Sequence, residues 1–465
     1  MMGKRVMAEP VFATVRIDDH LPANHLLRAV DAVLDTAFVR RIMAPHYSLI
    51  GRPSIDPELM IRMLLVGYLG GIRSERKLCA GMRLNLAHRW FCRLGVDDAV
   101  PNHSTFSKNR HRRFRDGHVF RAVFEQVVRC CVEAGLVPGE GAAVDGSHVD
   151  ADASRHKRLP GHRVPDAWTT DRKAQARPKA LARPVRAHLG ALDAAVPPGP
   201  DEPRHEAPKY LSPTDPAAAW SIEHGVGVFA YETNLLVDTA HGIIVDVEAT
   251  PARLSQEIVA AKATLARAEA ALGFAPCCLG ADKSYGTGPC LAWLLARGVE
   301  PHVPVLDRTA QTDGMFTRES FTYIEAKDAW RCPSGHMLRA AALDRSTGMK
   351  KYLARAGDCR TCALKPQCTT AKARGLSVSI HEPAHKAAQA LAGTRAYAQS
   401  QRWRQKVEIL FAHLKQQFGI RRLRLRGLQG AAEEFHLAAA VQNLRRLARL
   451  TVCGLSGQAG TAAFG

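Results

Sequence analysis

The sequence predicts an α/β protein in which a mixed sheet with packed helices follows an all-α N-terminal domain. Three observations lead to this expectation. Residues 20–135 show the helical spacing of apolar side chains and the start and stop residues of several short helices. From residue 141 onward, apolar runs of strand length alternate with helical segments, which is typical of a mixed sheet covered by helices. A cysteine-containing insertion interrupts this second part at residues 309–378.

The N-terminal helical part ends in a basic helix. In SIDPELMIRMLLVGYLGG, Asp56 is the expected N-cap, Pro57 the first helical residue and the Gly-Gly pair the stop signal. Ser104 is the expected cap of a later helix. The first turns of that helix carry the basic residues Lys108, Arg110, Arg112, Arg113 and Arg115. A run of short helices ending in a basic one suits a DNA-reading domain, and a helical bundle with a solvated basic face is the alternative.

The strands begin in the second part of the chain. Residues 141–153 predict the first strand, and residues 225–249 predict two more, joined at Asp238–Gly242. The later elements are expected in the order helix, strand, helix, strand and two long helices, at about 255–272, 276–282, 289–298, 300–306, 386–418 and 428–450.

These elements divide the chain into four parts. The expected parts are a helical domain at 1–135, an α/β domain at 136–308 and 379–452, a linker or insertion at 158–216, and a Cys-rich insertion at 309–378. The linker assignment depends on composition, because its later part is rich in proline, arginine and alanine. No internal repeat is apparent in the sequence.

The charge balance points to a polyanionic partner. The chain has 64 Lys and Arg against 44 Asp and Glu, a formal net charge of +20. A surface this basic favours nucleic acid, with a membrane surface or simple solubility as the alternatives. No apolar run reaches the roughly 18 residues of a membrane-spanning helix, and the first residues lack the apolar stretch of a secretory signal. Twelve cysteines without an export signal indicate reduced thiols in a cytosolic compartment.

Three carboxylates from distant parts of the chain form the candidate site. Asp145 lies on the first strand in AVDGSHVDAD, Asp282 ends a later strand in GADKSYG, and Glu408 lies on a late helix. Strand ends let carboxylates project into an open site, and a few carboxylates suffice for Mg²⁺, which prefers oxygen ligands. Two such ions can activate a nucleophile and stabilise the leaving oxygen of a phosphodiester. Asp150 and Asp152 are the rivals of Asp145, and a simple turn residue is the alternative interpretation of Asp145 itself.

The late helix places Glu408 beside two cations. At about 100° per residue, Arg404, Glu408 and Lys415 fall within about 40° of one another. An adjacent apolar stripe consists of Val407, Phe411, Leu414 and Phe418. The helix can therefore pack by that stripe and present a metal ligand next to two cations able to meet phosphate. An ordinary amphipathic helix with an i,i+4 Arg–Glu pair is the alternative.

Five motifs occur in one order along the chain. Arg404, Glu408 and Lys415 match R-x3-E-x6-K, and Asp282 is followed three residues later by Tyr285. The other three are AVDGSHVDADAS, LSPTDPAAAW and HSTFSKNRHR. In these motifs the sequence resembles the DDE transposases of bacterial insertion sequences, in the group with a Y-x2-R-x3-E-x6-K signature. The resemblance extends over nearly the whole chain, from about residue 15 to residue 450.

One position departs from the signature. The pattern places a tyrosine three residues before the arginine, where this chain has Gln401. Tyr397 lies four residues further back, about one helical turn away, and Trp403 is also close. Gln401 cannot stack as a tyrosine does, so the departure affects one expected DNA contact and none of the metal ligands.

The resemblance implies a ribonuclease-H-like fold, with Asp145 on its first strand, Asp282 after its fourth and Glu408 on a late helix. These three carboxylates would hold two Mg²⁺ ions, for which Mn²⁺ can substitute. The implied reaction is hydrolysis of phosphodiesters at terminal inverted repeats, after which the freed 3′-hydroxyls attack target DNA. The implied setting is the bacterial cytoplasm, at the nucleoid, with double-stranded DNA and a second copy of the chain as partners and no membrane. A domesticated metal-dependent nuclease and a non-cleaving protein that binds inverted repeats are the alternatives.

Basic residues are the expected DNA contacts. The segment GIRRLRLRG at 419–427 suits sequence-independent, salt-sensitive contacts to phosphate, and a solvated basic loop is the alternative. The full set of expected DNA-binding residues is Arg404, Lys415, Tyr285, Arg421, Arg422, Arg424, Arg426, Lys108, Arg110, Arg112 and Arg113.

A cluster of cysteines in the insertion has metal-ligand spacing. The candidate structural Zn²⁺ ligands are Cys332, Cys359, Cys362 and Cys368, and His336 is a substitute for one of them. A closed zinc site would stabilise an insertion too polar to build its own core. Only one CxxC pair is present, and reduced cysteines without metal are the alternative.

Overall fold

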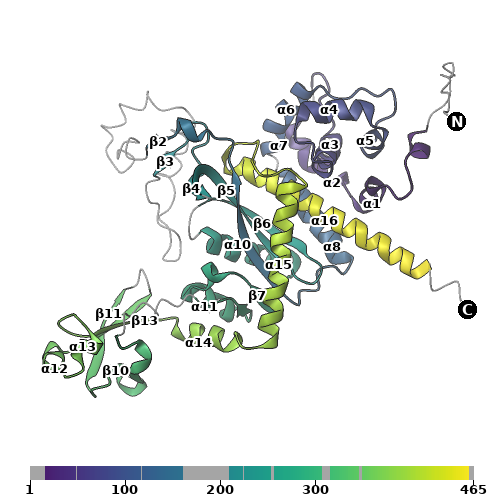
Figure 1. Cartoon of the computed structure of the whole chain (residues 1–465). Coiled ribbons are helices and arrows are strands. Elements are labelled where there is room, and N and C mark those ends of the chain that lie inside the picture. Colours follow the sequence, from purple (N-terminus) through teal and green to yellow (C-terminus); the bar gives the residue numbers. More distant parts are fainter. Residues whose placement is uncertain are drawn as a thin grey trace, which may run out of the picture. The chain divides into compact units, whose positions relative to one another are not determined.

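The computed structural model forms two compact units. The first contains Met1–Leu136, His413–Ile420 and Glu433–Gly465, and the second contains Val137–Ala412 and Arg421–Ala432 (Figure 1). The structure describes residues 16–48, 50–116, 118–160, 209–223, 225–252, 256–305, 315–344 and 348–459. Most of the insertion expected at 158–216 therefore lies outside the described residues.

The N-terminal segment of the first unit is a series of short helices. Their bounds are α1 Leu26–Val33, α2 Ala37–Met43, α3 Pro57–Leu69, α4 Glu75–Leu84, α5 Leu86–Phe91, α6 His103–His111, α7 Arg113–Asp116 and α8 Val119–Glu133. The expected cap of α3 is confirmed, because the Asp56 side chain accepts hydrogen bonds from the backbone N–H groups of Glu58 and Leu59. The expected cap of α6 is wrong. Asn102 caps this helix by accepting from the Ser104 N–H, so Ser104 is already a helical residue.

The core of the first unit is built around α3. Every residue from Met60 to Tyr68 is buried, which is typical of a helix surrounded by others. The last helix, α16 Gly427–Ala459, adds buried apolar side chains that include Phe435, Leu437, Val441 and Leu444. Arg73 pairs with Glu434 of α16 at 2.5 Å and donates to the Gly419 carbonyl oxygen at 2.7 Å. The N-terminal helices thus share one unit with residues more than 300 positions later in the sequence.

The second unit contains a six-stranded mixed sheet. Its strands are β1 Ala142–Asp150, β4 Ala219–Glu223, β5 Val226–Asp238, β6 Ile243–Pro251, β7 Cys278–Gly280 and β8 Glu300–His302. The strand β1 is antiparallel to β5 on one side and parallel to β7 on the other, and β8 continues the parallel part. The strands β4 and β6 pair with successive parts of β5. The expected mixed α/β class and the hairpin after residue 225 are confirmed.

Helices cover this sheet. Their bounds are α10 Gln256–Leu272, α11 Gly288–Ala296, α14 Glu382–Leu391 and α15 Arg395–Gln416. One core cluster combines Val144 of β1 and Leu236 of β5 with apolar residues of α10, α11 and α14. The single helix expected over 386–418 is wrong. The chain breaks between α14 and α15 at residues 392–394, where Thr394 accepts a side-chain hydrogen bond from the Tyr397 N–H and starts α15.

The cysteines of the insertion lie in the segments that connect the strands of a second, smaller sheet. Its antiparallel strands are β9 Thr322–Ile324, β10 Ala329–Arg331, β11 Met337–Asp344, β12 Met349–Ala354 and β13 Gly375–Ser379. Two short helices, α12 Ala356–Arg360 and α13 Lys365–Cys368, lie between β12 and β13. We call residues 315–379 the Cys module. Its buried core consists of Phe321, Leu338, Tyr352, Ala354, Cys368, Leu376 and Val378.

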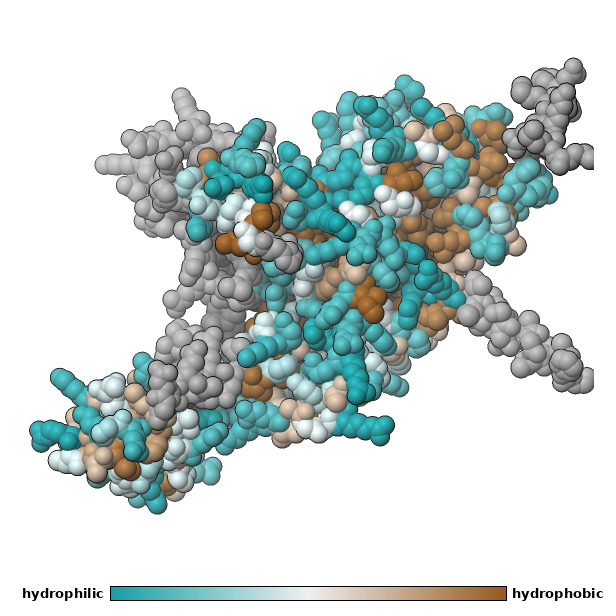
Figure 2. All heavy atoms as spheres, viewed as in Figure 1, coloured by the Kyte–Doolittle hydropathy of each residue, from teal (hydrophilic) through white to brown (hydrophobic). Residues whose placement is uncertain are grey.

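The surface of the described residues is mostly hydrophilic on the viewed face (Figure 2). Figure 2 shows hydrophilic residues over most of the viewed face, with hydrophobic residues in groups between them. Large exposed hydrophobic side chains such as Ile50, Leu84 and Ile222 are scattered along the sequence, as is normal for protein surfaces. Within the described residues, no helix is long and apolar enough to cross a membrane.

Candidate active site

Asp145 lies where β1 loses one of its neighbours. The strand β7 pairs only with Ala142 and Ala143, so the edge of β1 is open at Asp145, while Leu235 of β5 pairs on the other side. The Asp145 side chain is only 18% exposed, and one of its oxygens accepts from the Gly146 N–H at 2.9 Å. Burial raises the pKa of Asp145 to about 6. A buried carboxylate at an open strand edge suits a cation ligand better than a turn residue.

Asp282 follows the neighbouring parallel strand. It caps the short helix η8 Lys283–Tyr285 and accepts hydrogen bonds from the Ser284 backbone N–H at 2.8 Å and hydroxyl at 2.6 Å. Because β1 and β7 are parallel neighbours, Asp145 and Asp282 lie toward the same edge of the sheet. The negative charge of Asp282 contributes to the raised pKa of Asp145, after the larger effect of burial.

Arg404 connects the first and third carboxylates. Its guanidinium lies 3.4 Å from an Asp145 oxygen and 3.3 Å from a Glu408 oxygen, one turn further along α15. The Glu408 side chain is 56% exposed. As the side chains stand in the described chain, no three His, Cys, Asp or Glu residues are grouped closely enough to hold one metal ion. The structure therefore brings Asp145 and Asp282 to one sheet edge and links Glu408 to Asp145 through an arginine.

The rivals of Asp145 make other contacts. The Asp150 backbone bonds to the chain at residues 421–423, through the Arg421 carbonyl and the Leu423 N–H. Asp152 pairs with Arg426 at 2.9 Å and lies 3.8 Å from Arg422. These contacts favour Asp145 as the carboxylate that faces Asp282.

Two further acidic residues lie at this edge of the sheet and were not expected from the sequence. Glu232 of β5 is 2% exposed, and its carboxylate lies 3.7 Å from the His148 ring. Glu257 of α10 has a carboxylate oxygen 2.9 Å from the Ser284 hydroxyl, the same hydroxyl that contacts Asp282. Burial, and then the neighbouring Glu257, raise the pKa of Glu232 well above its ordinary value. Glu232 could have been suspected from the sequence, because it is an acidic residue within the largely apolar stretch FAYETNLLVD.

Gly146 makes room for these polar groups. A Cβ at this position would lie 3.0 Å from the Glu232 carboxylate carbon and 3.2 Å from the Asn234 side-chain oxygen. Both neighbours are almost fully buried on the adjacent strand. The residue after Asp145 is therefore a glycine because the adjacent strand approaches closely.

The arginines after α15 lie on the short connection to α16. We call residues 421–426 the arginine segment. Leu423 and Leu425 are buried, while the exposed arginines are Arg421, Arg422, Arg424 and Arg426. A parallel bridge to Asp150 ties the segment to the end of β1. Lys415, also expected to contact DNA, is half-buried on the last turn of α15 and belongs to the other unit.

Two expected DNA contacts are corrected by their burial. Tyr285 is 1% exposed within the core cluster below the sheet edge, so its ring does not reach a surface. Arg110 is 5% exposed and pairs with Glu75 at 3.4 Å. Arg110 occupies the inward side of α6, which sequence spacing alone did not distinguish from the outward side.

The other basic residues of this helical region lie at or near its surface. Lys108 and Arg112 are exposed. Arg113 is half-buried, and its guanidinium lies 4.9 Å from the centre of the Tyr47 ring.

Gln401, which stands where the signature has a tyrosine, contacts the sheet. The Gln401 side-chain amide donates a hydrogen bond to the His302 carbonyl oxygen at the end of β8. Tyr397, one turn earlier, meets the His302 ring edge-on, with 5.6 Å between ring centroids. In this chain both residues contact β8, which fixes the start of α15 against the sheet.

Comparison with known families decides the assignment. A family model described as Transposase domain (DUF772) matches residues 15–112, and one described as Transposase DDE domain matches residues 331–448. These two matches support a DDE-type insertion-sequence transposase. The DDE match to this transposase contains Arg404, Glu408 and Lys415, whereas Asp145 and Asp282 lie before its start. A search of curated proteins found no match to the transposase.

Proposed function

We propose that the transposase cuts phosphodiesters at the terminal inverted repeats of its insertion sequence and joins the freed 3′-hydroxyls to target DNA. One observation carries this proposal. Arg404 contacts Asp145 and Glu408 together, and Asp282 acts electrostatically on Asp145, so the three carboxylates expected for this reaction belong to one network. The two matching transposase family models support the same reaction class.

The fold of the proposed catalytic domain is ribonuclease-H-like. The supporting observation is the order strand, antiparallel hairpin, helix, parallel strand, with β1 in the middle of the sheet. In this proposal, residues 136–308 and 379–452 form the catalytic domain, and the helical region at 1–135 contributes to DNA binding. The group with the Y-R-E-K signature is the proposed subgroup, with Gln401 in place of its tyrosine.

The donor chemistry fits divalent metal. Asp145, Asp282 and Glu408 supply carboxylate oxygens, the ligands that Mg²⁺ and Mn²⁺ prefer. The raised pKa of Asp145 fits as well, because a nearby cation would offset the cost of ionising a buried carboxyl group. Two bound ions would activate the attacking oxygen and stabilise the leaving oxygen of the phosphodiester.

The protein's own groups would position the DNA. Arg404 is half-buried and holds Asp145 and Glu408, so it orients carboxylates rather than extending freely into solvent. The exposed arginines of the arginine segment lie beyond the end of β1 and suit contacts to phosphates of double-stranded DNA. A second copy of the chain on the DNA would account for joining two ends, in the bacterial cytoplasm at the nucleoid.

Cleavage of labelled DNA that carries the element's own end tests this proposal. With Mg²⁺ or Mn²⁺, the wild type should nick at the end, and Asp145→Ala, Asp282→Ala and Glu408→Ala should each reduce nicking by about 10²–10³-fold or more. DNA binding by the variants should persist. Glu140→Gln, an exposed carboxylate just before β1, is the matched control and should cleave normally.

The other outcomes separate the alternatives. A wild type that binds the ends and never cuts them with either metal would replace the catalytic proposal with a DNA-binding role. Residual cutting by Asp145→Ala alone would move the metal ligand to Asp150 or Asp152. Absence of terminal inverted repeats around the gene, together with cutting of other DNA, would favour a domesticated nuclease.

A further inference from the structure

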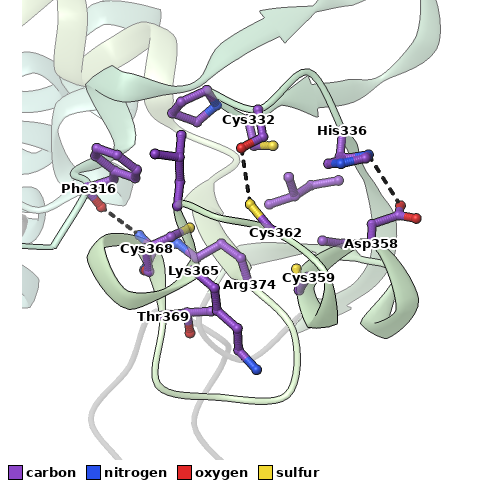
Figure 3. A pocket seen from close by; sticks show the side chains of 15 residues that line it. Phe316, Cys332, His336, Asp358, Cys359, Cys362, Lys365, Cys368, Thr369 and Arg374 are labelled. Atoms are coloured by element: carbon purple, nitrogen blue, oxygen red, sulfur yellow. Dashed lines mark hydrogen bonds and ion pairs between the residues drawn. The ribbon is translucent and has the colours of Figure 1, made fainter.

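Four cysteines of the Cys module surround one cavity. Cys332 follows β10, Cys359 lies in α12, Cys362 lies between the two short helices, and Cys368 ends α13. All four are free thiols, and all four line the same cavity together with His336 (Figure 3). Four separate positions along the module therefore place their thiols around the same cavity.

The sulfurs are close enough to influence one another. The Cys368 thiol is 9% exposed and interacts electrostatically with the thiols of Cys332, Cys359 and Cys362. Cys332 and Cys359 also pack against the buried core of the module. Three thiols thus interact with the buried thiol of Cys368, which distinguishes this cluster from the other described cysteines.

Tight turns hold the outer cysteines in place. The Cys332 N–H donates to the His336 carbonyl oxygen at 2.9 Å, and the Gly335 N–H donates back to the Cys332 carbonyl oxygen at 2.8 Å. Gly335 has φ +85°, a conformation that favours glycine in this turn. At the second corner, the Lys365 N–H donates to the Cys362 carbonyl oxygen at 3.1 Å. The turn at Cys332 and the corner after Cys362 thus fix two of the cysteines, and the Ser334 hydroxyl in the first turn lies 3.1 Å from the Cys362 sulfur.

The module has little apolar core of its own. Its seven buried core residues include Cys368 itself, and the exposed strand residues Tyr323, Leu343 and Leu353 add nothing to the interior. Small sheets with so few buried side chains are stabilised in other proteins by disulfides or metal. Disulfides are rare in cytosolic proteins, which favours metal as the cross-link.

We propose that Cys332, Cys359, Cys362 and Cys368 bind one structural Zn²⁺ ion as four thiolates. As the thiols stand in the described residues, no three of them are grouped closely enough for a metal ion. Binding therefore draws the sulfurs inward to tetrahedral Zn–S distances of about 2.3 Å, and each thiol releases its proton to solvent. This proposal does not depend on the proposed reaction of the carboxylates.

His336 is not a ligand in this proposal. Its Nδ1 atom lies 4.0 Å from an Asp358 oxygen, and its side chain is 46% exposed. Figure 3 shows the ring directed toward Asp358. This contact favours the set of four cysteines over a set in which His336 replaces one of them.

Cations beside the cavity match the charge of the proposed site. Zn²⁺ with four thiolates has a net charge of −2, and Lys365 and Arg374 both line the cavity. Arg374 donates to the carbonyl oxygens of Cys368 and Phe316, yet its Nε atom is buried without an acceptor among the described residues. A thiolate would be a suitable acceptor for this orphaned donor.

Metal analysis of the purified 465-residue chain, prepared with added zinc, tests the proposal. Elemental analysis should give one zinc per chain, released on titrating the thiols with a mercurial. Cobalt substitution should give the visible absorption of a tetrahedral four-thiolate site. The intensity of this spectrum reports the number of thiolate ligands in the wild-type protein. The test therefore does not depend on whether cysteine variants fold.

Single variants then assign the ligands. Cys332→Ser, Cys359→Ser, Cys362→Ser and Cys368→Ser should each lose most of the bound zinc. His336→Ala should keep it, as should Cys277→Ser, an exposed cysteine outside the module. A wild type without bound metal, or with disulfides among these cysteines, would overturn the proposal. Loss of zinc in His336→Ala with retention in one cysteine variant would overturn the ligand set.

Discussion

At the scale of single residues, Asp145 shows how burial changes a carboxyl group. Burial raises its pKa from an ordinary value of 3.8 to about 6, because burial disfavours the charged form. The folded state therefore binds the proton more tightly than the unfolded state. The stability that this proton contributes is present below pH 4 and is lost as the pH rises through 6. At pH 8 the ionised carboxylate should cost about 3 kcal/mol of folding free energy, an order-of-magnitude figure.

Replacing the Asp145 carboxyl group by an amide tests how much its ionisation lowers the folding stability. In the presence of a chelator, Asp145→Asn should raise the melting temperature by several degrees at pH 8 and leave it nearly unchanged at pH 4. Thermal unfolding followed by circular dichroism measures both values. Glu140→Gln removes an exposed carboxylate close to the same strand and should change neither. Equal stabilisation at both pH values would show that ionisation is not the cause.

At the scale of elements, β1 depends on a glycine beside the candidate ligand. A Cβ at Gly146 would lie 3.0 Å from the buried Glu232 carboxylate, and the paired strand cannot easily move away. Gly146→Ala should therefore lower the free energy of unfolding by about 1–3 kcal/mol, as overpacking does in cores. Urea unfolding measures the loss.

Two variants control this prediction. Adding Glu232→Ala should recover part of the stability, because it removes the obstructing carboxylate. Gly357→Ala, in α12, places its new methyl group in open space and should be close to neutral. A Gly146→Ala protein as stable as the wild type would show that β5 adapts more freely than its burial implies.

The arginine segment is a second element with a measurable role. If Arg421 and Arg424 contact phosphates, removing both charges should reduce the salt dependence of DNA binding. The slope of log K against log salt should become shallower by about 2, for specific and random duplexes alike. Fluorescence anisotropy at several salt concentrations measures this slope. The matched pair Arg339→Ala and Arg360→Ala removes two exposed arginines of the Cys module, and an equal effect there would indicate only general charge attraction.

At the scale of the whole molecule, the first unit is assembled from both ends of the chain. Arg73 and Glu434 are 361 residues apart and meet at 2.5 Å, with the Glu434 side chain 1% exposed. Arg73→Ala removes the 2.5 Å ion pair of this buried carboxylate. It should lower the free energy of unfolding of this unit by about 3–5 kcal/mol.

The measurement is urea unfolding of the full chain. Arg129→Ala disrupts a more exposed pair with Glu125 in the same unit and should cost less than about 1 kcal/mol. Combining Arg73→Ala with Glu434→Leu should recover much of the loss, because both charges of the pair are then removed. Similar small losses for Arg73→Ala and Arg129→Ala would contradict the structural role of the buried pair.

Local features of the sequence predicted the elements and the principal carboxylates. The Asp56 cap, the hairpin after residue 225 and the mixed α/β class follow from spacing and short-range hydrogen bonding, which neighbouring residues determine. The resemblance in R-x3-E-x6-K, likewise a local pattern, led to the family that the two family models support. The roles of Asp145, Asp282 and Glu408 as metal ligands remain predictions.

Only the tertiary structure decided which side chains face one another. It buried Tyr285 and Arg110, which a sequence motif and a basic helix had favoured as DNA contacts, and brought Glu232 and Glu257 to the edge where Asp145 and Asp282 lie. It also joined the C-terminal helix to the N-terminal ones through Arg73 and residues beyond 413. Burial and pairing at these positions depend on groups tens to hundreds of residues away, and no local pattern encodes which face of a helix or strand such distant groups will cover.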